Sequence, residues 1–170
     1  MRHLRPARLL LLALACLTPA GPASADVTAF LGSSSAGDGK GVKGVAVGTG
    51  ILVVGFEFEF ASTPESVADA APGLRTGMGN VLLQTPFAIH GVQPYATTGA
   101  GMYRETLTAQ GAGQPARQET SLGFNSGGGV KIGIAGPLRL RLDYRVFTLR
   151  GSPVTSSPMH RFYAGANLRF

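Results

Sequence analysis

The sequence contains very little cysteine, tryptophan or charge. Among its 170 residues Cys16 is the only cysteine, tryptophan is absent, and charged residues make up 14%. A lone cysteine excludes an internal disulfide, and with so few histidines the chain is not expected to hold a structural zinc or any other metal. The apolar run from Leu9 to Leu17 is also shorter than the roughly 20 residues of a membrane-spanning helix.

Sequence motifs for nucleophilic catalysis and phosphate binding are missing as well. No G-x-S-x-G segment occurs, and "GFNSGGGVK" fails the phosphate-loop pattern because Gly129 stands where that pattern requires lysine. The histidines outside the N-terminal segment, His90 and His160, are far apart in the sequence. We therefore expect no catalytic residues, no cofactor and no enzymatic activity.

The first 25 residues have the three parts of a secretory signal peptide. Arg2, Arg5 and Arg8 precede the apolar run, and "ASA" at 23–25 fits a cleavage site. We therefore expect residues 1–25 to be a signal peptide and residues 26–170 to be one domain. A lipoprotein signal ending at Cys16 is the alternative, but the leucine expected three positions before that cysteine is absent. Removal of three arginines lowers the formal net charge from +6 to +3, too little for a nucleic-acid-binding face.

Beyond this segment, the 25 glycines and a period-two alternation of apolar and polar residues indicate β-strands. The pattern predicts eight strands, at about 26–35, 41–50, 52–62, 74–87, 92–105, 118–133, 137–150 and 159–170. After the first connection, short turns alternate with longer loops rich in Pro, Gly and Ala. This is typical of an up-and-down transmembrane barrel with short periplasmic turns and external loops. The predicted loops are 36–40, 62–73, 106–117 and 151–158, with both chain ends in the periplasm.

Each predicted strand has one apolar face and one polar or glycine-rich face. In 52–62, for example, Phe56, Phe58 and Phe60 alternate with Glu57 and Glu59. Period-two alternation also fits a soluble, lipocalin-like barrel with its apolar faces inside. However, the faces that carry the charges also carry the glycines, and small residues suit the narrow interior of an eight-stranded barrel. We therefore predict that the apolar faces contact lipid.

This assignment places a network of charges in the interior, or lumen. The predicted members are Glu57, Glu59, Lys131, Arg139, Arg141, Asp143 and Arg145, with Glu105 or Glu119 nearer the outer rim. Ion pairs among them are expected to plug the lumen. Tyr95 and Tyr103, which share a face eight residues apart, are predicted to lie in two interfacial girdles, joined by Tyr144 and Phe162.

The last ten residues, "RFYAGANLRF", end in an aromatic residue on an alternating strand. The positions Gly165, Leu168 and Phe170 resemble the C-terminal signal by which the bacterial barrel-assembly machinery recognises outer-membrane barrels. We therefore predict that this machinery is a transient partner during biogenesis.

Together, "DVTAFLG", "ILVVGFEFEFAST", "LRTGMGNVLLQTP", "GGGVKIGIAGPLRLRLDYRVF" and "RFYAGANLRF" resemble the small outer-membrane β-barrels of the opacity-protein and OmpA-type class, within the porin-like group. The resemblance implies an all-β, eight-stranded antiparallel barrel embedded in the lipid bilayer of the outer membrane, but it carries no functional residues. The expected role is structural or surface interaction through the external loops, with an unknown external ligand and no nucleic acid. The alternatives are a soluble periplasmic barrel that binds an apolar ligand and a barrel enzyme that acts on lipid.

Overall fold

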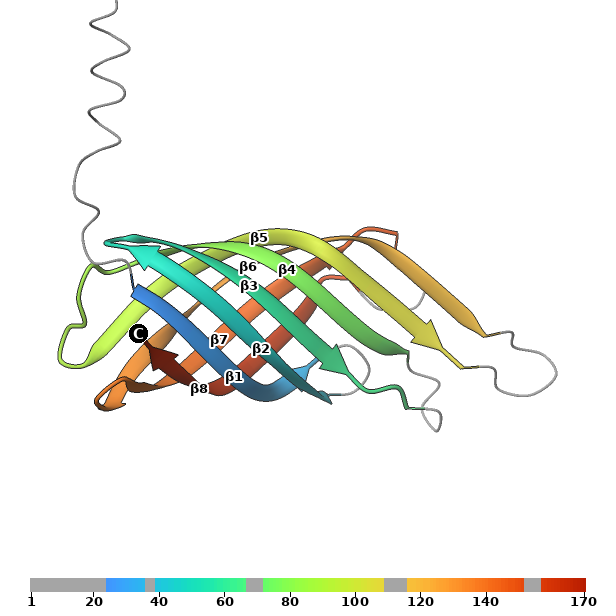
Figure 1. Cartoon of the computed structure of the whole chain (residues 1–170). Coiled ribbons are helices and arrows are strands. Elements are labelled where there is room, and N and C mark those ends of the chain that lie inside the picture. The colour runs from blue at the N-terminus through green and yellow to red at the C-terminus, as the bar shows by residue number, and fades with distance from the viewer. Residues whose placement is uncertain (1–23, 36–38, 67–71, 109–115, 152–156) are drawn as a thin grey trace, which may run out of the picture.

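The computed structural model describes residues 24–35, 39–66, 72–108, 116–151 and 157–170. They form a closed barrel of eight antiparallel strands in which each strand pairs with its chain neighbours and the last pairs with the first (Figure 1). The strands are β1 (Ser24–Ser34), β2 (Lys40–Ile51), β3 (Val54–Thr63), β4 (Gly73–Gln84), β5 (Val92–Leu107), β6 (Arg117–Ala135), β7 (Leu138–Leu149) and β8 (Met159–Arg169). Within the described ranges, no helix has the length and apolarity required to cross a membrane. The predicted fold class is confirmed.

The predicted signal peptide lies almost entirely outside the described residues, which begin at Ser24. Ser24 and Ala25, placed in the signal peptide by the sequence pattern, are the first residues of β1 and pair with Gly50 and Thr49 of β2. Cleavage after Ala25 would therefore shorten β1 by two residues. The position of cleavage stays a prediction.

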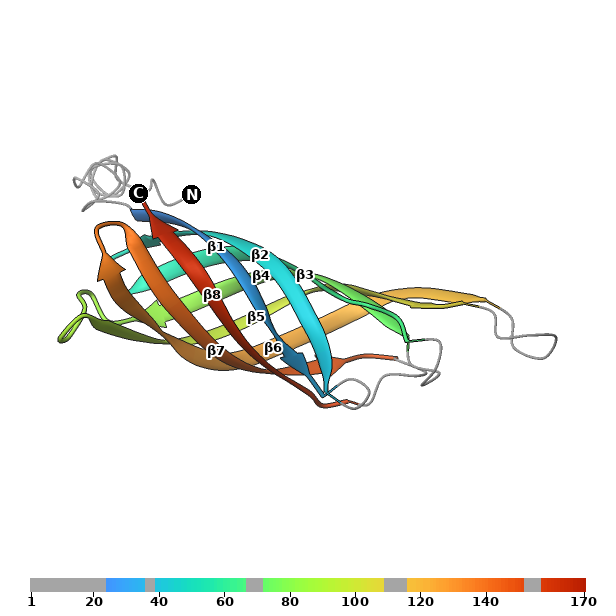
Figure 2. The ribbon, with the colours of Figure 1, turned by 90° about the horizontal axis from the view of Figure 1, so that it is seen from below.

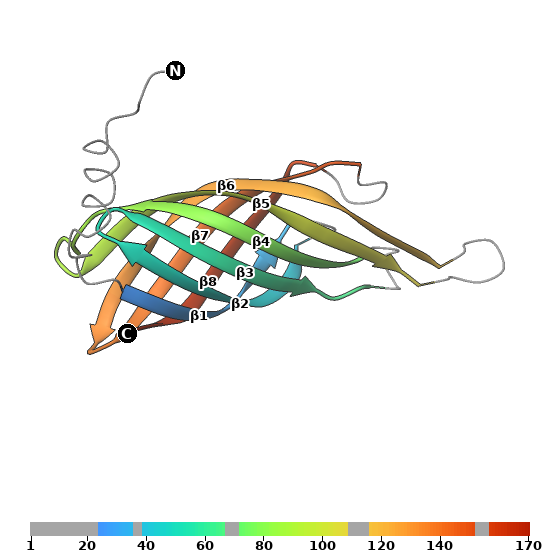
Figure 3. The ribbon, with the colours of Figure 1, turned by 45° about the horizontal axis from the view of Figure 1, so that its top comes forward.

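The two ends of the barrel differ in the length of their connections. One end of the barrel, called here the turn end, holds the connections β2–β3, β4–β5 and β6–β7 (Figure 3). The first and last described residues of the chain lie at the same end. The opposite end, called the loop end, carries the other connections. At the loop end β5 and β6, with 16 and 19 residues, extend past the neighbouring strands (Figure 2). This hairpin is longer than the sequence pattern predicted.

The connection between β4 and β5 differs from its prediction. β4 ends at Gln84, so Phe87, predicted to lie in the strand, belongs to a seven-residue turn. Pro86 has no N–H group for a strand ladder, and the hydroxyl of Thr85 donates a hydrogen bond of 2.9 Å to the carbonyl of Phe87. His90, the residue before Gly91, adopts a positive φ of 51°, which reverses the chain locally.

The structure confirms which faces of β3 and β7 point outward. Phe56, Phe58 and Phe60 are 59, 68 and 61% exposed, whereas Glu57 and Glu59 between them are 2 and 1% exposed. Along β7, Arg141, Asp143 and Arg145 are buried in the interior, while Leu140 and Tyr144 face outward. The soluble alternative placed these apolar faces inside the barrel, whereas on β3 and β7 they lie outside.

Candidate functional site

The middle of the lumen holds a compact cluster of charged side chains from strands on opposite walls. β3 supplies Glu57 and Glu59, and β7, four strands away around the eight-stranded ring, supplies Arg141, Asp143 and Arg145. All five point inward because they occupy alternate positions of their strands. Ion pairs between β3 and β7 therefore cross the lumen.

Arg145 lies at the centre of this cluster and is completely buried. Its guanidinium group is 2.9 Å from Glu57 Oε1, 2.9 Å from Glu59 Oε2 and 3.3 Å from Asp143 Oδ1. Its Cζ atom also lies 5.6 Å from the centre of the Tyr163 ring. Arg145 thus joins all three central carboxylates.

Arg141 makes a second bridge across the lumen. Its Nη1 atom donates to Glu57 Oε2, and its Nε atom donates to Asp143 Oδ2 at 2.6 Å. The Nε atom also lies 2.8 Å from the hydroxyl of Tyr95, whose ring the guanidinium group overlies at 5.1 Å. Charge-assisted bonds in such a buried setting are stronger than those at a surface.

Two charged members of the interior were missed by the sequence analysis. Arg161 of β8 is fully buried, donates to Thr76 Oγ1 at 3.0 Å and lies 4.0 Å from Glu59 Oε1. Asp26 of β1 pairs with Lys131 at 2.5 Å. Both share the inward parity of their strands, and this signal would have found them. The sequence analysis considers the last ten residues only as an assembly signal and Asp26 only as the first residue after cleavage, so neither charge was counted.

With Arg161 included, the charges of the central cluster balance. Three carboxylates, those of Glu57, Glu59 and Asp143, face three guanidinium groups, and Asp26 and Lys131 form a separate pair. This balance is the condition under which ions are tolerated away from water. Removal of a single member would therefore leave an uncompensated charge in the interior.

The predicted girdle positions of Tyr95 and Tyr103 are wrong. Both side chains point into the lumen and are 6 and 1% exposed. Tyr103 donates a hydrogen bond of 2.8 Å to the carbonyl of Arg150, which closes the barrel near the loop end. The two tyrosines do share one face of β5, as predicted, but that face points into the interior. Tyr144 and Phe162 do face outward.

Above the charged cluster, towards the loop end, the lumen is filled by apolar side chains. They are Leu74, Met78, Tyr103, Phe147, Leu149 and Met159, all buried. Met159 and Phe147 are directly paired across β7 and β8. The interior thus changes from ionic at its middle to apolar near the loops.

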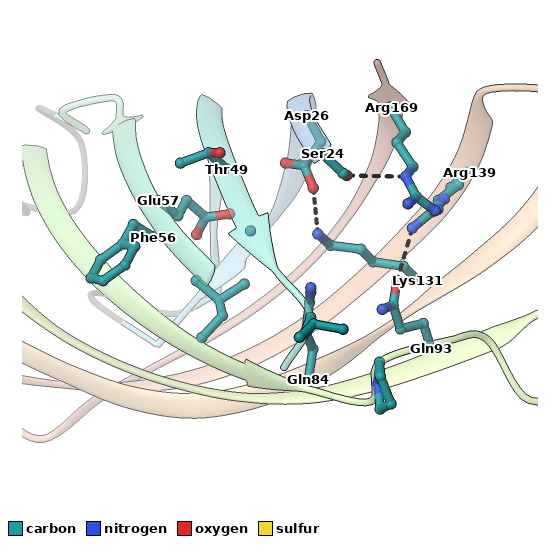
Figure 4. A pocket seen from close by; sticks show the side chains of 15 residues that line it. Ser24, Asp26, Thr49, Phe56, Glu57, Gln84, Gln93, Lys131, Arg139 and Arg169 are labelled. Atoms are coloured by element: carbon teal, nitrogen blue, oxygen red, sulfur yellow. Dashed lines mark hydrogen bonds and ion pairs between the residues drawn. The ribbon is translucent and has the colours of Figure 1, made fainter. Parts of the chain in front are cut away.

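At the turn end the lumen opens into a cavity of about 100 Å³ (Figure 4). Lys131, predicted to belong to the charge network, binds Asp26 at the wall of this cavity. Arg139, also predicted there, donates to Gln93 Oε1 at 2.9 Å instead of contacting a carboxylate. Arg169 donates to Ser24 Oγ at 3.0 Å on the adjoining strand. The seven predicted residues thus divide into a central group of five and two residues at the turn-end mouth.

Leu168 and Phe170 of the predicted C-terminal signal lie on the outer wall, whereas Gly165 shares the inward parity of Tyr163 and Asn167. Leu168 and Phe170 are 43 and 74% exposed, and Gly165 pairs with Phe30 of β1 and Arg141 of β7. A Cβ atom at Gly165 would lie 2.8 Å from Cβ of Phe30, so a larger residue would push β1 and β8 apart. Closure of the barrel is one reason for glycine here, and recognition by an assembly machinery stays a prediction.

Glu65 makes a defined polar contact at the loop end. Glu65 accepts hydrogen bonds from the backbone N–H and the hydroxyl of Thr108, at 2.5 and 2.8 Å. Glu65 therefore links the connection after β3 to the end of β5.

We expect this link to respond to acid. The bonds from Thr108, the backbone bond first, hold the pKa of Glu65 below its ordinary value of 4.5. The link is therefore complete above pH 4.5 and is lost only as the pH falls below this value, through the lowered pKa. Amide exchange at Thr108 measured between pH 3 and 6 should accelerate at the acid end. Glu65→Gln, which retains an acceptor but cannot titrate, should remove this acid-induced step; a step that persists in this variant would contradict the assignment.

Among the described residues, no group of three or more His, Cys, Asp and Glu side chains is placed to hold a metal ion. The Nδ1 atom of His160 lies 2.7 Å from the hydroxyl of Tyr144 on the outer wall. His90 lies in the β4–β5 turn at the opposite end of the barrel. These two histidines, which are far apart in the sequence, are thus also far apart in the fold.

Comparison of the structure with solved proteins shows the same architecture in small outer-membrane barrels. The N-terminal β-barrel domain of Pseudomonas aeruginosa OprF matches with a TM-score of 0.66 at 14% identity, covering 86% of this chain and 97% of that domain. Neisserial surface protein A (NspA) matches with a TM-score of 0.65 at 15% identity, covering 89% and 98%. The outer membrane enzyme PagL matches with a TM-score of 0.51 at 12% identity, covering 84% and 98%. No family model and no curated protein sequence matches the chain. The resemblance inferred from the sequence is therefore confirmed at the level of the fold.

Proposed function

We propose that the protein is a non-catalytic, integral β-barrel of a bacterial outer membrane, with its loop end at the cell surface. The observation that carries this proposal is the distribution of side chains on the barrel. Large apolar groups cover the outside of the strands, and paired ions occupy the inside. A bilayer is the solvent that such a surface requires, since backbone groups are satisfied by the closed sheet and only the side chains meet lipid.

The same geometry supports a lumen that is closed to passive diffusion. Ion pairs from Arg141 and Arg145 to Glu57 join opposite walls of the barrel, and the apolar cluster around Phe147 lies on the loop side of them. An eight-stranded barrel has room for little beyond its own side chains. The protein would therefore act through its surfaces instead of conducting solutes.

A structural or surface-interaction role fits the asymmetry of the two ends. The β5–β6 hairpin extends beyond the neighbouring strands only at the loop end, and the bond between Glu65 and Thr108 links the connection after β3 to the loop end of β5. One solved barrel of this architecture is described as a surface protein and another as an enzyme, so the fold alone does not decide between these roles. Non-catalysis is supported by the central carboxylates, which are all held in ion pairs with arginine.

Envelope fractionation combined with epitope display tests the location and the orientation. An epitope inserted between Thr108 and Ala116 should be stained by antibody on intact cells, whereas one inserted after His90 should be stained only after the outer membrane is permeabilised. The barrel should require detergent for extraction and should migrate faster on gels before heating than after. Recovery of the protein in the fluid released by osmotic shock would contradict the proposal.

A further inference from the structure

Charges on the outer wall of the barrel are of one sign and lie at one end. The outward positions of the described strands and of the residue that follows β7 include Lys43, Arg75, Arg104 and Arg150, but no Asp or Glu. All four lie near the loop end of their strands. The opposite, turn end has no outward-facing charged residue on its strands.

Strand register places three of these cations in one row. Lys43 pairs with Ser62, Ser62 with Arg75, and Arg75 with Arg104, across β2, β3, β4 and β5. Arg75 and Arg104 are thus directly opposite each other, an arrangement in which like charges repel. No carboxylate within the described residues pairs with Lys43, Arg75 or Arg104. An anion between them would remove the repulsion.

The row lies on the boundary of the apolar band. One step towards the turn end, the corresponding outward positions on the same strands are Val45, Phe60, Gly77 and Met102. Lys43 and Arg75 are two strands apart, so their Cα atoms are separated by roughly 10 Å. Two long basic side chains at this separation, with the hydroxyl of Ser62 between them, can converge on one phosphate group.

The outer wall beside Lys43 and Arg75 is hollowed into a groove of about 750 Å³, which these two residues help to line. Its apolar lining includes the small residues Ala29, Ala164, Gly165 and Ala166 of β1 and β8 and the larger Leu31 and Phe60. The volume lies within the roughly 300–1,000 Å³ typical of ligand clefts. The groove thus combines an apolar lining with two basic side chains.

We propose that this groove, named here the basic-topped groove, binds one phosphorylated glycolipid of the outer leaflet. An acyl chain occupies the apolar part, and a headgroup phosphate is held by Lys43 and Arg75, with Arg104 beside them. The proposal rests on the outer-membrane location proposed above. A second copy of the chain is a poor occupant, because a symmetric contact would bring two basic rows together with no carboxylate on either wall.

Native mass spectrometry of the full barrel in detergent micelles, titrated with purified diphosphorylated lipid A, tests the headgroup site. Wild type should retain one lipid. Lys43→Gln combined with Arg75→Gln should bind it roughly 30-fold more weakly, since each cation near an anionic headgroup contributes about 1 kcal/mol. Arg150→Gln, which removes an outward cation far from the groove, is the matched control and should bind as wild type. Equal binding by the double variant, or equal binding of dephosphorylated lipid A, would overturn the proposal.

Filling the groove tests the acyl-chain site independently of charge. Ala164→Leu with Ala166→Leu should weaken lipid retention, whereas Ala100→Leu, on the outward face of β5, should not. All of these leucines would face outward, and unchanged heat-dependent gel mobility would show that the barrels fold. If the wild-type protein were a dimer and the groove-filling variant a monomer, the occupant would be a second copy of the chain, and the proposal would be overturned. Because the assay uses micelles, failure to bind lipid is distinguishable from failure of the protein to reach the outer membrane.

Discussion

Arg145→Gln is expected to lower the free energy of unfolding by about 3–5 kcal/mol, the cost of removing one partner from a buried ion pair. Arg145 contacts Glu57, Glu59 and Asp143 in a part of the lumen where its own side chain is fully buried. Without it, three carboxylates share Arg141 and the more distant Arg161. The loss is large because the uncompensated negative charge has no access to bulk water.

Urea unfolding of the refolded barrel in lipid vesicles, followed by circular dichroism, measures this loss. Arg139→Gln is the control, because Arg139 lies at the turn-end mouth and bonds Gln93 instead of a carboxylate. Adding Glu59→Gln to Arg145→Gln should recover part of the lost stability, since the two changes together preserve the charge balance. A loss below about 1 kcal/mol for Arg145→Gln, typical of a surface ion pair, would show that the cluster is hydrated.

The sequence was sufficient to predict the sidedness of the barrel because the alternation of residues carries that information directly. Phe58 and Glu59 are adjacent in the chain and must face opposite sides of a strand. Once one of the two faces is assigned to the interior, the direction of every side chain on the strand follows. The size of the interior residues supplied that decision. Residues such as Gly129, which lies against Tyr95 in the lumen, leave the space that the larger side chains occupy.

The pairing of interior charges could not be predicted in the same way. Glu57 meets Arg141 and Arg145 because β3 and β7 are on opposite walls at matching heights, and those heights depend on the register of every intervening strand. The irregularity between Gly133 and Ala135, where β6 shifts against β7, changes that register and has no clear signal in the sequence. The groove on the outer wall likewise depends on β1 and β8 meeting at barrel closure.

Phe58→Arg should destabilise the barrel in lipid vesicles by about 2–4 kcal/mol more than Phe58→Ala does, the cost of a cation near the middle of the hydrocarbon region. Phe58 is 68% exposed on the outer wall. It lies on β3 four residues from Ser62, which stands in the row of cations, and is nearer the turn end than Ser62 is. The alanine variant removes the ring without adding charge, so the difference between the two variants isolates the effect of the cation.

The depth of the substitution provides the control. Leu122→Arg places the same cation next to the boundary row, because Leu122 pairs with Met102 while Thr120 pairs with Arg104, and it should cost only about 0–1 kcal/mol. A water-soluble barrel would show no such dependence, since an arginine at either outward position would be hydrated. Equal effects at Phe58 and Leu122 would therefore contradict the membrane location, whereas a graded cost would locate the apolar band between the basic row and the turn end.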